Sequence, residues 1–184
     1  MIKVWNYKNF YNARNKAIIA MLFETGIRNN ELCNLRLLDV RETLIKVLGK
    51  GNKERYVPIS PALKKILIKY ERIRNEYIKD KFVTEDYYFL SYRSKQLTIE
   101  AVERVVKETG VRAKVRKEIR CSPHTCRHYF AQAQLRNGLD VYSLSRLLGH
   151  EDISITKRYL QGLEDRNIVE ISVKTSPLMS LRVK

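Results

Sequence analysis

The residues best suited to chemistry gather in the last third of the sequence. All three histidines lie between residues 124 and 150 of a chain of 184. Residues three apart on a helix face the same side, so the imidazole of His124 and the guanidinium of Arg127 would converge on one ligand. Gly149 is typical of a left-handed helix end and would present His150 there, with Tyr159 one short helix further on. The spacing predicts one site that combines imidazoles, a guanidinium and a phenol.

A zinc site is the main alternative for this stretch. Four possible ligands, Cys121, His124, Cys126 and His128, lie between residues 121 and 128. A structural zinc site usually pairs two ligand clusters separated by a loop, whereas this sequence offers a single cluster on a predicted helix. We therefore expect no metal. We interpret Cys33 and Cys126 as small buried side chains without a chemical role.

The chain is strongly basic, with 36 Lys and Arg against 20 Asp and Glu and a formal net charge of +16. Such a charge predicts a polyanionic partner, either nucleic acid or an acidic membrane. The longest strongly apolar stretch, residues 17–23, is far shorter than the roughly 20 residues that cross a bilayer, so we expect no membrane span. The N-terminus lacks a secretory signal, and three cysteines are a poor basis for disulfides. We therefore expect one large cytoplasmic domain.

The apolar pattern predicts a mainly α-helical fold with a small antiparallel β-hairpin, which is an α+β class. A helix is predicted over residues 13–25, ending at Gly26, and Asn30 is predicted to cap a short helix after it. Residues 43–48 and 55–59 are rich in β-formers and flank a Gly- and Lys-rich turn, the pattern of a hairpin.

The rest of the chain alternates helix starts with turn residues. Residues 87–90 fit one further strand, and Gly110 is predicted to end the helix that follows it. The predicted helix starts are Ser60, Thr98, Ser122, Asp140 and either Asp152 or Ser154.

Five motifs occur in one order along this chain. They are TGIRNNEL at 25–32, GKGNKERYVP at 49–58, HxxRH at 124–128, LLGH at 147–150 and Tyr159. Each motif alone is weak, but together they resemble the tyrosine recombinase family, also called phage integrases. The resemblance runs from about Arg14 to Tyr159, and none of the matched positions departs from the family pattern.

The resemblance implies a catalytic residue at each of six positions and a supporting acid beside the first. These residues are Arg28, Lys50, His124, Arg127, His150 and Tyr159, with Glu31 as the supporting acid. It also implies the tyrosine recombinase catalytic-domain fold and a reaction in which DNA is cut and rejoined through a 3′-phosphotyrosyl intermediate and a Holliday junction. No ATP, metal or other cofactor is then required.

The residue types suit the charge that such a reaction develops on phosphorus. Arg28 and Arg127 can each direct parallel N–H donors at nonbridging phosphate oxygens, and a guanidinium stays charged at any relevant pH. By resemblance His150 adds a further donor. The set would stabilise a crowded, dianionic phosphorane-like state.

Proton transfer falls to the remaining members of the set. A tyrosine hydroxyl has a reference pKa of about 10, so Tyr159 needs a cationic neighbourhood or a base before it attacks. His124 is the candidate base or proton shuttle. Lys50, on the hairpin turn, is the candidate acid for the departing 5′ oxygen, and Lys53 on the same turn is the alternative.

The expected organisation is a catalytic domain over residues 1–163 followed by a tail, residues 164–184, that docks on a neighbouring protomer or packs back on its own domain. An N-terminal core-binding domain is expected to be absent from this chain. We expect double-stranded DNA as the partner, a homotetramer for the full-length protein, and a monomer for this fragment, with weak, salt-sensitive DNA binding of little sequence choice. A type IB topoisomerase and a noncatalytic DNA-binding module are the two alternatives.

Overall fold

The computed structural model describes residues 1–83, 85–162 and 165–174, with the backbone alone at residues 50, 161–162, 165–168 and 174. The chain divides into two compact units, Met1–Arg127 and His128–Lys184, and the boundary falls within helix α5 (Pro123–Arg136). The described residues are mostly helical with one two-stranded antiparallel sheet, so the predicted fold class is confirmed. In this part of the chain no helix combines the length and apolar character that a membrane span requires.

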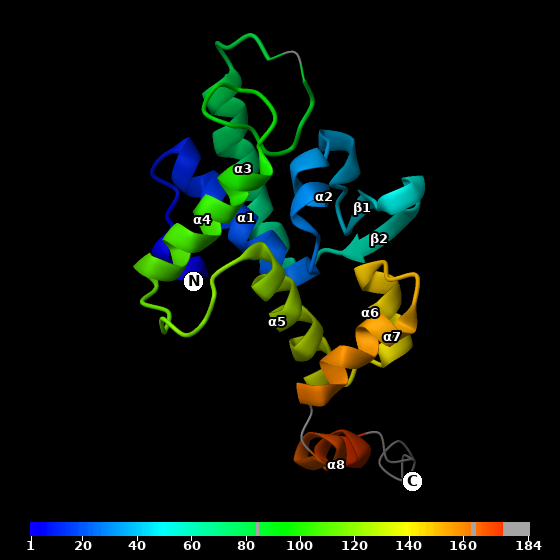
Figure 1. Cartoon of the computed structure of the whole chain (residues 1–184). Helices are drawn as coiled ribbons and strands as arrows, with labels where there is room; N and C mark the ends of the chain where they lie inside the picture. The colour runs from blue at the N-terminus through cyan, green and yellow to red at the C-terminus, as the bar shows by residue number, and fades with distance from the viewer. Residues whose placement is uncertain (84, 163–164, 175–184) are drawn as a thin grey trace, which may run out of the picture. The chain divides into compact units, whose positions relative to one another are not determined.

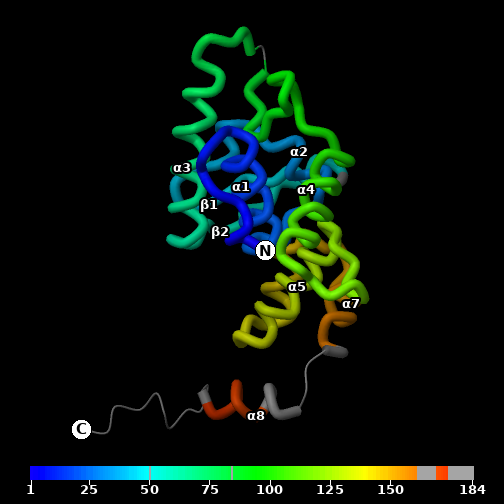
Figure 2. The backbone as a smooth tube through the Cα atoms, turned by 90° about the vertical axis from the view of Figure 1, so that its left-hand side faces the viewer, coloured from blue at the N-terminus to red at the C-terminus, as the bar shows by residue number. Residues whose placement is uncertain are grey.

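Helix α1 (Phe10–Thr25) is the centre of the first unit and lies between α3 (Pro61–Ile78) and α4 (Ile99–Arg112) (Figures 1 and 2). Its middle segment, residues 17–22, is apolar on every side and fully packed, and the adjacent residues Ile18 and Ile19 are both fully buried. The helix ends as predicted at Gly26, whose φ of 59° is the left-handed conformation that glycine adopts without strain. A short 3-10 helix, η1 (Ile2–Val4), precedes Trp5, whose indole N–H donates to Thr109 Oγ1 of α4 over 2.8 Å.

The predicted hairpin is present. Strands β1 (Leu44–Leu48) and β2 (Glu54–Pro58) pair antiparallel, with Val47 opposite Arg55. The turn between them contains η3 (Lys50–Asn52) and is closed by the Gly49 N–H, which donates to the Lys53 carbonyl over 2.8 Å. The inner face carries Val47 together with Ile45 and Val57, all buried in the main core, while helix α2 (Asn29–Asn34) and η2 (Leu37–Asp39) precede the hairpin.

Two predicted helix boundaries were wrong for identifiable reasons. Helix α2 begins two residues earlier than predicted, with Arg28 rather than Asn30 as its N-cap, because the Glu31 carboxylate accepts the Arg28 backbone N–H. Helix α4 continues through Gly110 to Arg112. A methyl group at Gly110 would overlap Cys121 Sγ and lie 2.9 Å from its Cβ, so this glycine permits close packing rather than ending the helix.

Residues 87–90 do not form the predicted strand and make only isolated bridges to their neighbours. The carbonyl groups of Tyr87 and Tyr88 accept hydrogen bonds from side chains of α3 instead. The Tyr70 hydroxyl donates to the Tyr88 carbonyl over 2.8 Å, and buried Arg74 donates to the carbonyls of Tyr87 and Tyr88 over 2.9 and 3.2 Å. The aromatic composition that suggested a strand serves a tertiary contact with α3.

The predicted N-caps Ser60, Thr98, Asp140 and Asp152 each accept a backbone N–H at the start of a helix, and Ser122 accepts the Thr125 N–H over 3.2 Å at the start of α5. The second unit continues with α6 (Val141–Leu148), α7 (Ile153–Lys157), η4 (Arg158–Gly162) and α8 (Asp165–Lys174). Its core contains Phe130, Ala131, Leu135, Leu144, Leu148 and Tyr159.

Candidate active site

Arg28 lies in the turn between α1 and α2. Thr25 closes the turn, since its hydroxyl donates to the Met21 carbonyl over 2.7 Å and accepts the Ile27 N–H over 3.2 Å. The left-handed Gly26 then reverses the chain, so that Arg28 begins the next helix. Its side chain is 41% exposed and therefore accessible to a ligand in solution.

Glu31 is the electrostatic centre of this turn. One oxygen of its buried carboxylate accepts Arg28 Nη1 over 2.9 Å and Arg55 Nη1 over 2.8 Å. The other oxygen accepts the Arg28 backbone N–H over 2.8 Å and Arg55 Nη2 over 2.7 Å. Burial by itself raises the pKa of Glu31, but the hydrogen bonds and charge of Arg55, followed by those of Arg28, lower it to about 2. Glu31 is therefore a carboxylate at any physiological pH.

Arg127 reaches the same turn from α5. Its side chain is buried, and Nη1 donates to the Gly26 carbonyl over 2.5 Å. Gly26 is two residues before Arg28, so the structure brings these two arginines to one turn. Burying a guanidinium is costly unless its donors are satisfied, and the carbonyl of a fixed turn meets part of that requirement.

The other two predicted site residues of the first unit are placed less completely. Lys50 is in the hairpin turn, and its backbone begins η3. Its side chain lies outside the described residues. His124 is the second residue of α5 and is exposed. It is three residues before Arg127, so the two share one side of the helix as predicted.

His150 and Tyr159 meet within the second unit. The His150 N–H bonds to the Ser145 carbonyl over 3.1 Å, and Gly149, with φ of 64°, donates to the Arg146 carbonyl, which is a Schellman ending of α6. The predicted left-handed helix end is therefore confirmed. The imidazole of His150 is nearly parallel to the Tyr159 ring, with an interplanar angle of 12° and centroids 6.4 Å apart.

Tyr159 is 8% exposed and also contacts His128, whose ring centroid is 5.0 Å away. The hydroxyl of buried Thr156 lies 2.8 Å from Nδ1 of His150. A hydroxyl that donates to Nδ1 keeps the proton of a neutral imidazole on Nε2. Thr156 is therefore placed to fix the orientation of His150, and we expect its hydroxyl to be the donor, which would keep the ring proton on Nε2.

Replacing Thr156 by Val should change the tautomer of His150. Valine keeps the shape of threonine but lacks the hydroxyl, so the fraction of the neutral ring with its proton on Nε2 should fall, at a stability cost of about 1 kcal/mol. Nitrogen-15 chemical shifts of the His150 ring measure this directly. Ser154→Ala, which changes an exposed residue of the same helix, should leave them unchanged. Identical ring shifts in Thr156→Val and the unsubstituted chain would contradict the assignment.

Two neighbours of the predicted site residues were missed from the sequence. Arg55 shares a face of β2 with the buried Val57, two residues later, and strand alternation could have placed it inward. His128 is one helical turn beyond His124, but its contact with Tyr159 joins residues far apart in sequence. No pattern within α5 reveals that contact.

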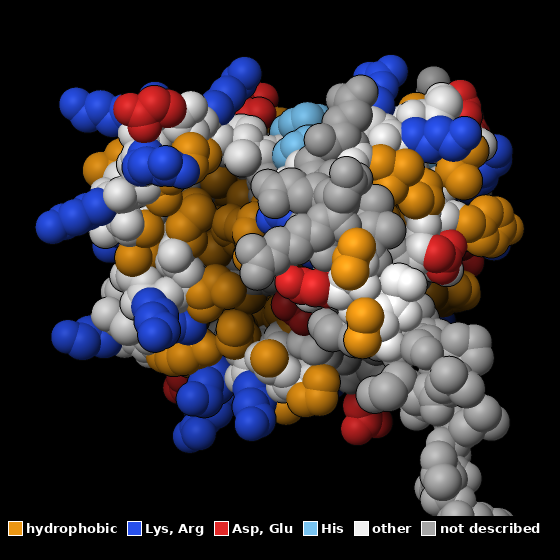
Figure 3. Space-filling view, turned by 90° about the horizontal axis from the view of Figure 1, so that it is seen from below, with side chains coloured by type: hydrophobic (Ala, Val, Ile, Leu, Met, Phe, Trp, Pro, Cys, Tyr) orange, Lys and Arg blue, Asp and Glu red, His pale blue; other side chains and the backbone are white. Residues whose placement is uncertain are grey.

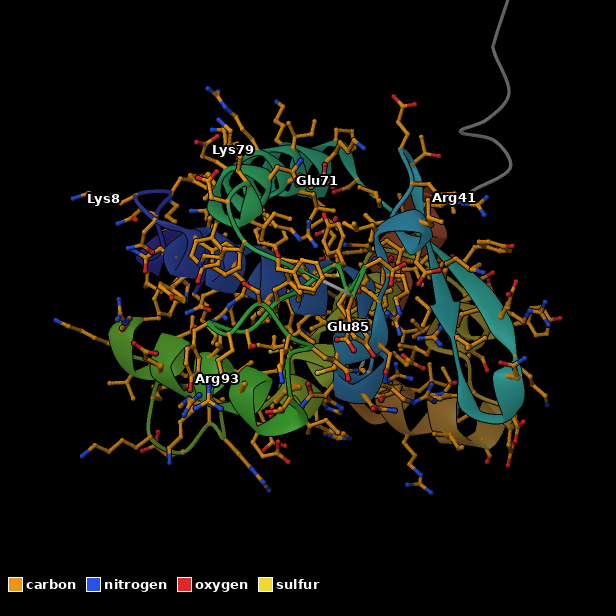
Figure 4. All side chains as sticks on the ribbon, turned by 90° about the horizontal axis from the view of Figure 1, so that it is seen from above. Lys8, Arg41, Glu71, Lys79, Glu85 and Arg93 are labelled. Carbon is orange, nitrogen blue, oxygen red and sulfur yellow. The ribbon has the colours of Figure 1, made fainter. Side chains whose placement is uncertain are left out.

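The basic excess is mainly a surface property. Lys and Arg side chains project from several sides of the face in Figure 3, and Lys8 and Lys79 point outward in Figure 4. Among the described residues only two arginines, Arg74 and Arg127, are buried. Arg74 bonds to carbonyls of the 87–90 segment, whereas Arg127 lies at the turn of Arg28. In the same part of the chain, no three His, Cys, Asp or Glu side chains group as metal ligands would.

The chain is similar to known proteins over most of its length. A model of the phage integrase family matches residues 1–166. The chain is 40% identical over 149 residues to the tyrosine recombinase XerD of Staphylococcus aureus. The matched region covers 79% of this chain and 49% of that protein. It is 38% identical over 169 residues to the tyrosine recombinase XerC of Thermodesulfovibrio yellowstonii, with 90% and 55% covered.

The fold also has a close counterpart among solved structures. The crystal structure of XerA recombinase is similar with a TM-score of 0.76 and 34% identity, covering 91% of this chain and 60% of that one. The chain thus spans about half the length of the curated relatives that it matches.

Proposed function

Because the chain belongs to the phage integrase family, whose members include the tyrosine recombinases, we propose that it is the catalytic segment of a site-specific DNA recombinase. It would cut one DNA strand with Tyr159, hold the strand as a 3′-phosphotyrosyl ester, and rejoin it to a different 5′ hydroxyl. The observation that supports this most directly is the pair of arginines, Arg28 and Arg127, held at one turn. The net charge of +16 supports double-stranded DNA as the partner.

The roles divide between phosphate stabilisation and proton transfer. Arg28 and Arg127 would donate to the nonbridging oxygens, and His150 would add a donor from Nε2 when Thr156 occupies its Nδ1. His124 would receive or relay the proton of the Tyr159 hydroxyl. Lys50 would give a proton to the leaving 5′ oxygen, and the ester bond to tyrosine preserves the energy needed for rejoining.

Covalent capture tests the proposal and identifies the DNA site in the same experiment. The chain is mixed with nicked duplexes of randomised sequence, in which the short fragment released after cleavage diffuses away and traps the adduct. Recovery and sequencing of the trapped DNA identify the sequences that the chain cleaves most readily, and the most frequent of them serves as the selected duplex in the experiments below. Absence of any adduct would refute the proposal. Relaxation of a supercoiled plasmid that lacks the selected site would assign the chain to topoisomerase chemistry instead.

Lys50→Ala should cleave the selected duplex at least about 100-fold more slowly than the unsubstituted chain, because an alkoxide leaving group needs a proton. Cleavage should recover on a duplex whose 5′ bridging oxygen is sulfur, since a thiolate leaves unprotonated. The measurement is the single-turnover rate of adduct formation on both substrates. Lys53→Ala is the matched control on the same turn. Sulfur rescue of Lys53→Ala alone would transfer the role to Lys53.

We also propose that the tail docks on a neighbouring protomer of a full-length recombinase tetramer. Val169 and Val173, one turn apart on α8, are 62% and 59% exposed, and such an apolar pair favours a partner surface. A chain ending at Gly162 should keep its cleavage rate on the selected duplex, while the same truncation in the full-length protein should abolish the tetramer on DNA. An unchanged tetramer by light scattering would contradict this docking.

A further inference from the structure

Arg55 is the one member of the Arg28–Glu31–Arg55 cluster to which the proposed reaction gives no role. It comes from β2, and its guanidinium meets both oxygens of Glu31 in a parallel, two-point contact of 2.8 and 2.7 Å. The two side chains are 10% and 5% exposed. Planar two-point contacts of this kind fix geometry as well as charge, which a lysine in the same place could not do.

The same carboxylate is also the support of Arg28. Glu31 accepts both the backbone N–H and the side chain of Arg28, so it receives four N–H groups from two arginines on different elements. One shared carboxylate therefore links Arg55 on the hairpin to the turn of Arg28, and Arg28 has two contacts of its own with that carboxylate. A buried ion pair does not by itself show that the fold is stabilised. The better attested role of buried ionic groups is to hold neighbouring elements in one specific conformation.

The hairpin turn lies against this cluster. Gly49, the residue before Lys50, is so near that a methyl group on it would lie 3.7 Å from Arg55 Nη1 and 3.9 Å from Glu31 Oε1. The Gly49 N–H closes the turn on the Lys53 carbonyl, and Arg55 follows that carbonyl by two residues. The backbone just before Lys50 thus passes close to the Glu31–Arg55 ion pair, within the reach of one methyl group.

We propose that Arg55 is a positioning residue which, through Glu31, ties the hairpin bearing Lys50 to the turn bearing Arg28. It thereby sets where the general acid stands relative to the arginine that binds the phosphate. Arg55 itself need not touch the DNA. This inference rests on the proposed function, because it assigns Arg55 to the delivery of a proton by Lys50.

The sulfur substrate separates this role from a merely structural one. Arg55→Gln should cleave the ordinary duplex about 100-fold more slowly, yet cleave the sulfur duplex within about threefold of the unsubstituted chain, because only proton delivery is lost. Arg55→Lys, which keeps the charge but lacks the planar fork, should behave in the same way. Glu54→Gln, an adjacent change that removes an exposed contact to Lys46, is the matched control and should keep both rates. An equal loss on both substrates, or full activity of Arg55→Lys, would overturn the proposal.

Two further measurements complete the test. If Arg55 acts through Glu31, then adding Arg55→Gln to Glu31→Gln should slow cleavage of the ordinary duplex by no more than about twofold, whereas independent actions would multiply. Amide hydrogen exchange at residues 49–53 should be about tenfold faster in Arg55→Gln than in Glu54→Gln. Equal amide exchange at residues 49–53 in the two variants would show that Arg55 does not hold the hairpin turn. This outcome would overturn the proposal even if the chain forms no adduct with DNA. Lack of adduct in the unsubstituted chain would refute only the proposed function.

Discussion

Tyr159→Phe should abolish the covalent adduct between this chain and the selected nicked duplex. Phenylalanine retains the ring that packs in the core of the second unit and faces His128 and His150, so the fold and DNA affinity should stay nearly unchanged. The hydroxyl that would attack phosphorus is the only group removed. Loss of the nucleophile in a covalent enzyme lowers the rate on the order of 10⁵-fold or more. Denaturing gel electrophoresis measures the adduct, and a mobility shift measures binding.

A second tyrosine supplies the control for this experiment. Tyr142 is 64% exposed on α6, in the same unit as Tyr159, and Tyr142→Phe should form the adduct at the unsubstituted rate. Peptide mapping of that adduct should place the DNA on Tyr159. An adduct that survives Tyr159→Phe would assign the nucleophile to another residue. Loss of DNA binding together with the adduct would show that Tyr159→Phe had altered more than the hydroxyl.

Features set by neighbours in the sequence could be predicted without the structure. Asp140 and Asp152 cap their helices because an Asp side chain reaches a backbone N–H two or three residues later. The left-handed Gly149 was equally predictable, and with it the place of His150 at a helix end. In each case the residue and its partner are separated by less than two helical turns.

Features that depend on distant partners could not be predicted. Gly110 has the composition of a helix stop, but Cys121 packs against it and the helix continues. Residues 87–90 have the composition of a strand, but the carbonyl groups of Tyr87 and Tyr88 accept hydrogen bonds from Arg74 and Tyr70 of α3. A single sequence carries no signal for such pairings.

The candidate site likewise combines contacts between near neighbours in the sequence with contacts between distant residues. The family resemblance predicted Glu31 as a support for Arg28, which are three residues apart, and the two are in contact. It did not supply Arg55, which lies 24 residues beyond Glu31. The alternation of β2 predicts that Arg55 faces inward with Val57, but only the structure identifies the carboxylate that it meets. The family resemblance therefore proposes positions for the chemistry, whereas the contacts that hold those positions required coordinates.

Glu31→Gln should have the largest effect on stability among the changes considered. It leaves the largely buried guanidinium of Arg55 facing an amide, and breaking a buried ion pair by removing one partner costs about 3–5 kcal/mol. Urea unfolding at pH 7, followed by circular dichroism, measures this cost. Glu108→Gln removes an exposed contact to Arg112 and should cost less than about 1 kcal/mol.

Acid provides an independent check on the same carboxylate. The pKa of Glu31 is lowered from 4.5 to about 2 in the fold, so its ionised form contributes stability that is fully present well above pH 4.5. This contribution is lost as the pH falls through the window from 4.5 to about 2, and the pKa difference corresponds to about 3 kcal/mol. The unsubstituted chain should therefore lose stability across this window by that much more than Glu31→Gln, which has no carboxylate to protonate. Parallel stability curves for the two chains below pH 4.5 would mean that Glu31 is not the buried, doubly paired carboxylate on which both Arg28 and Arg55 depend.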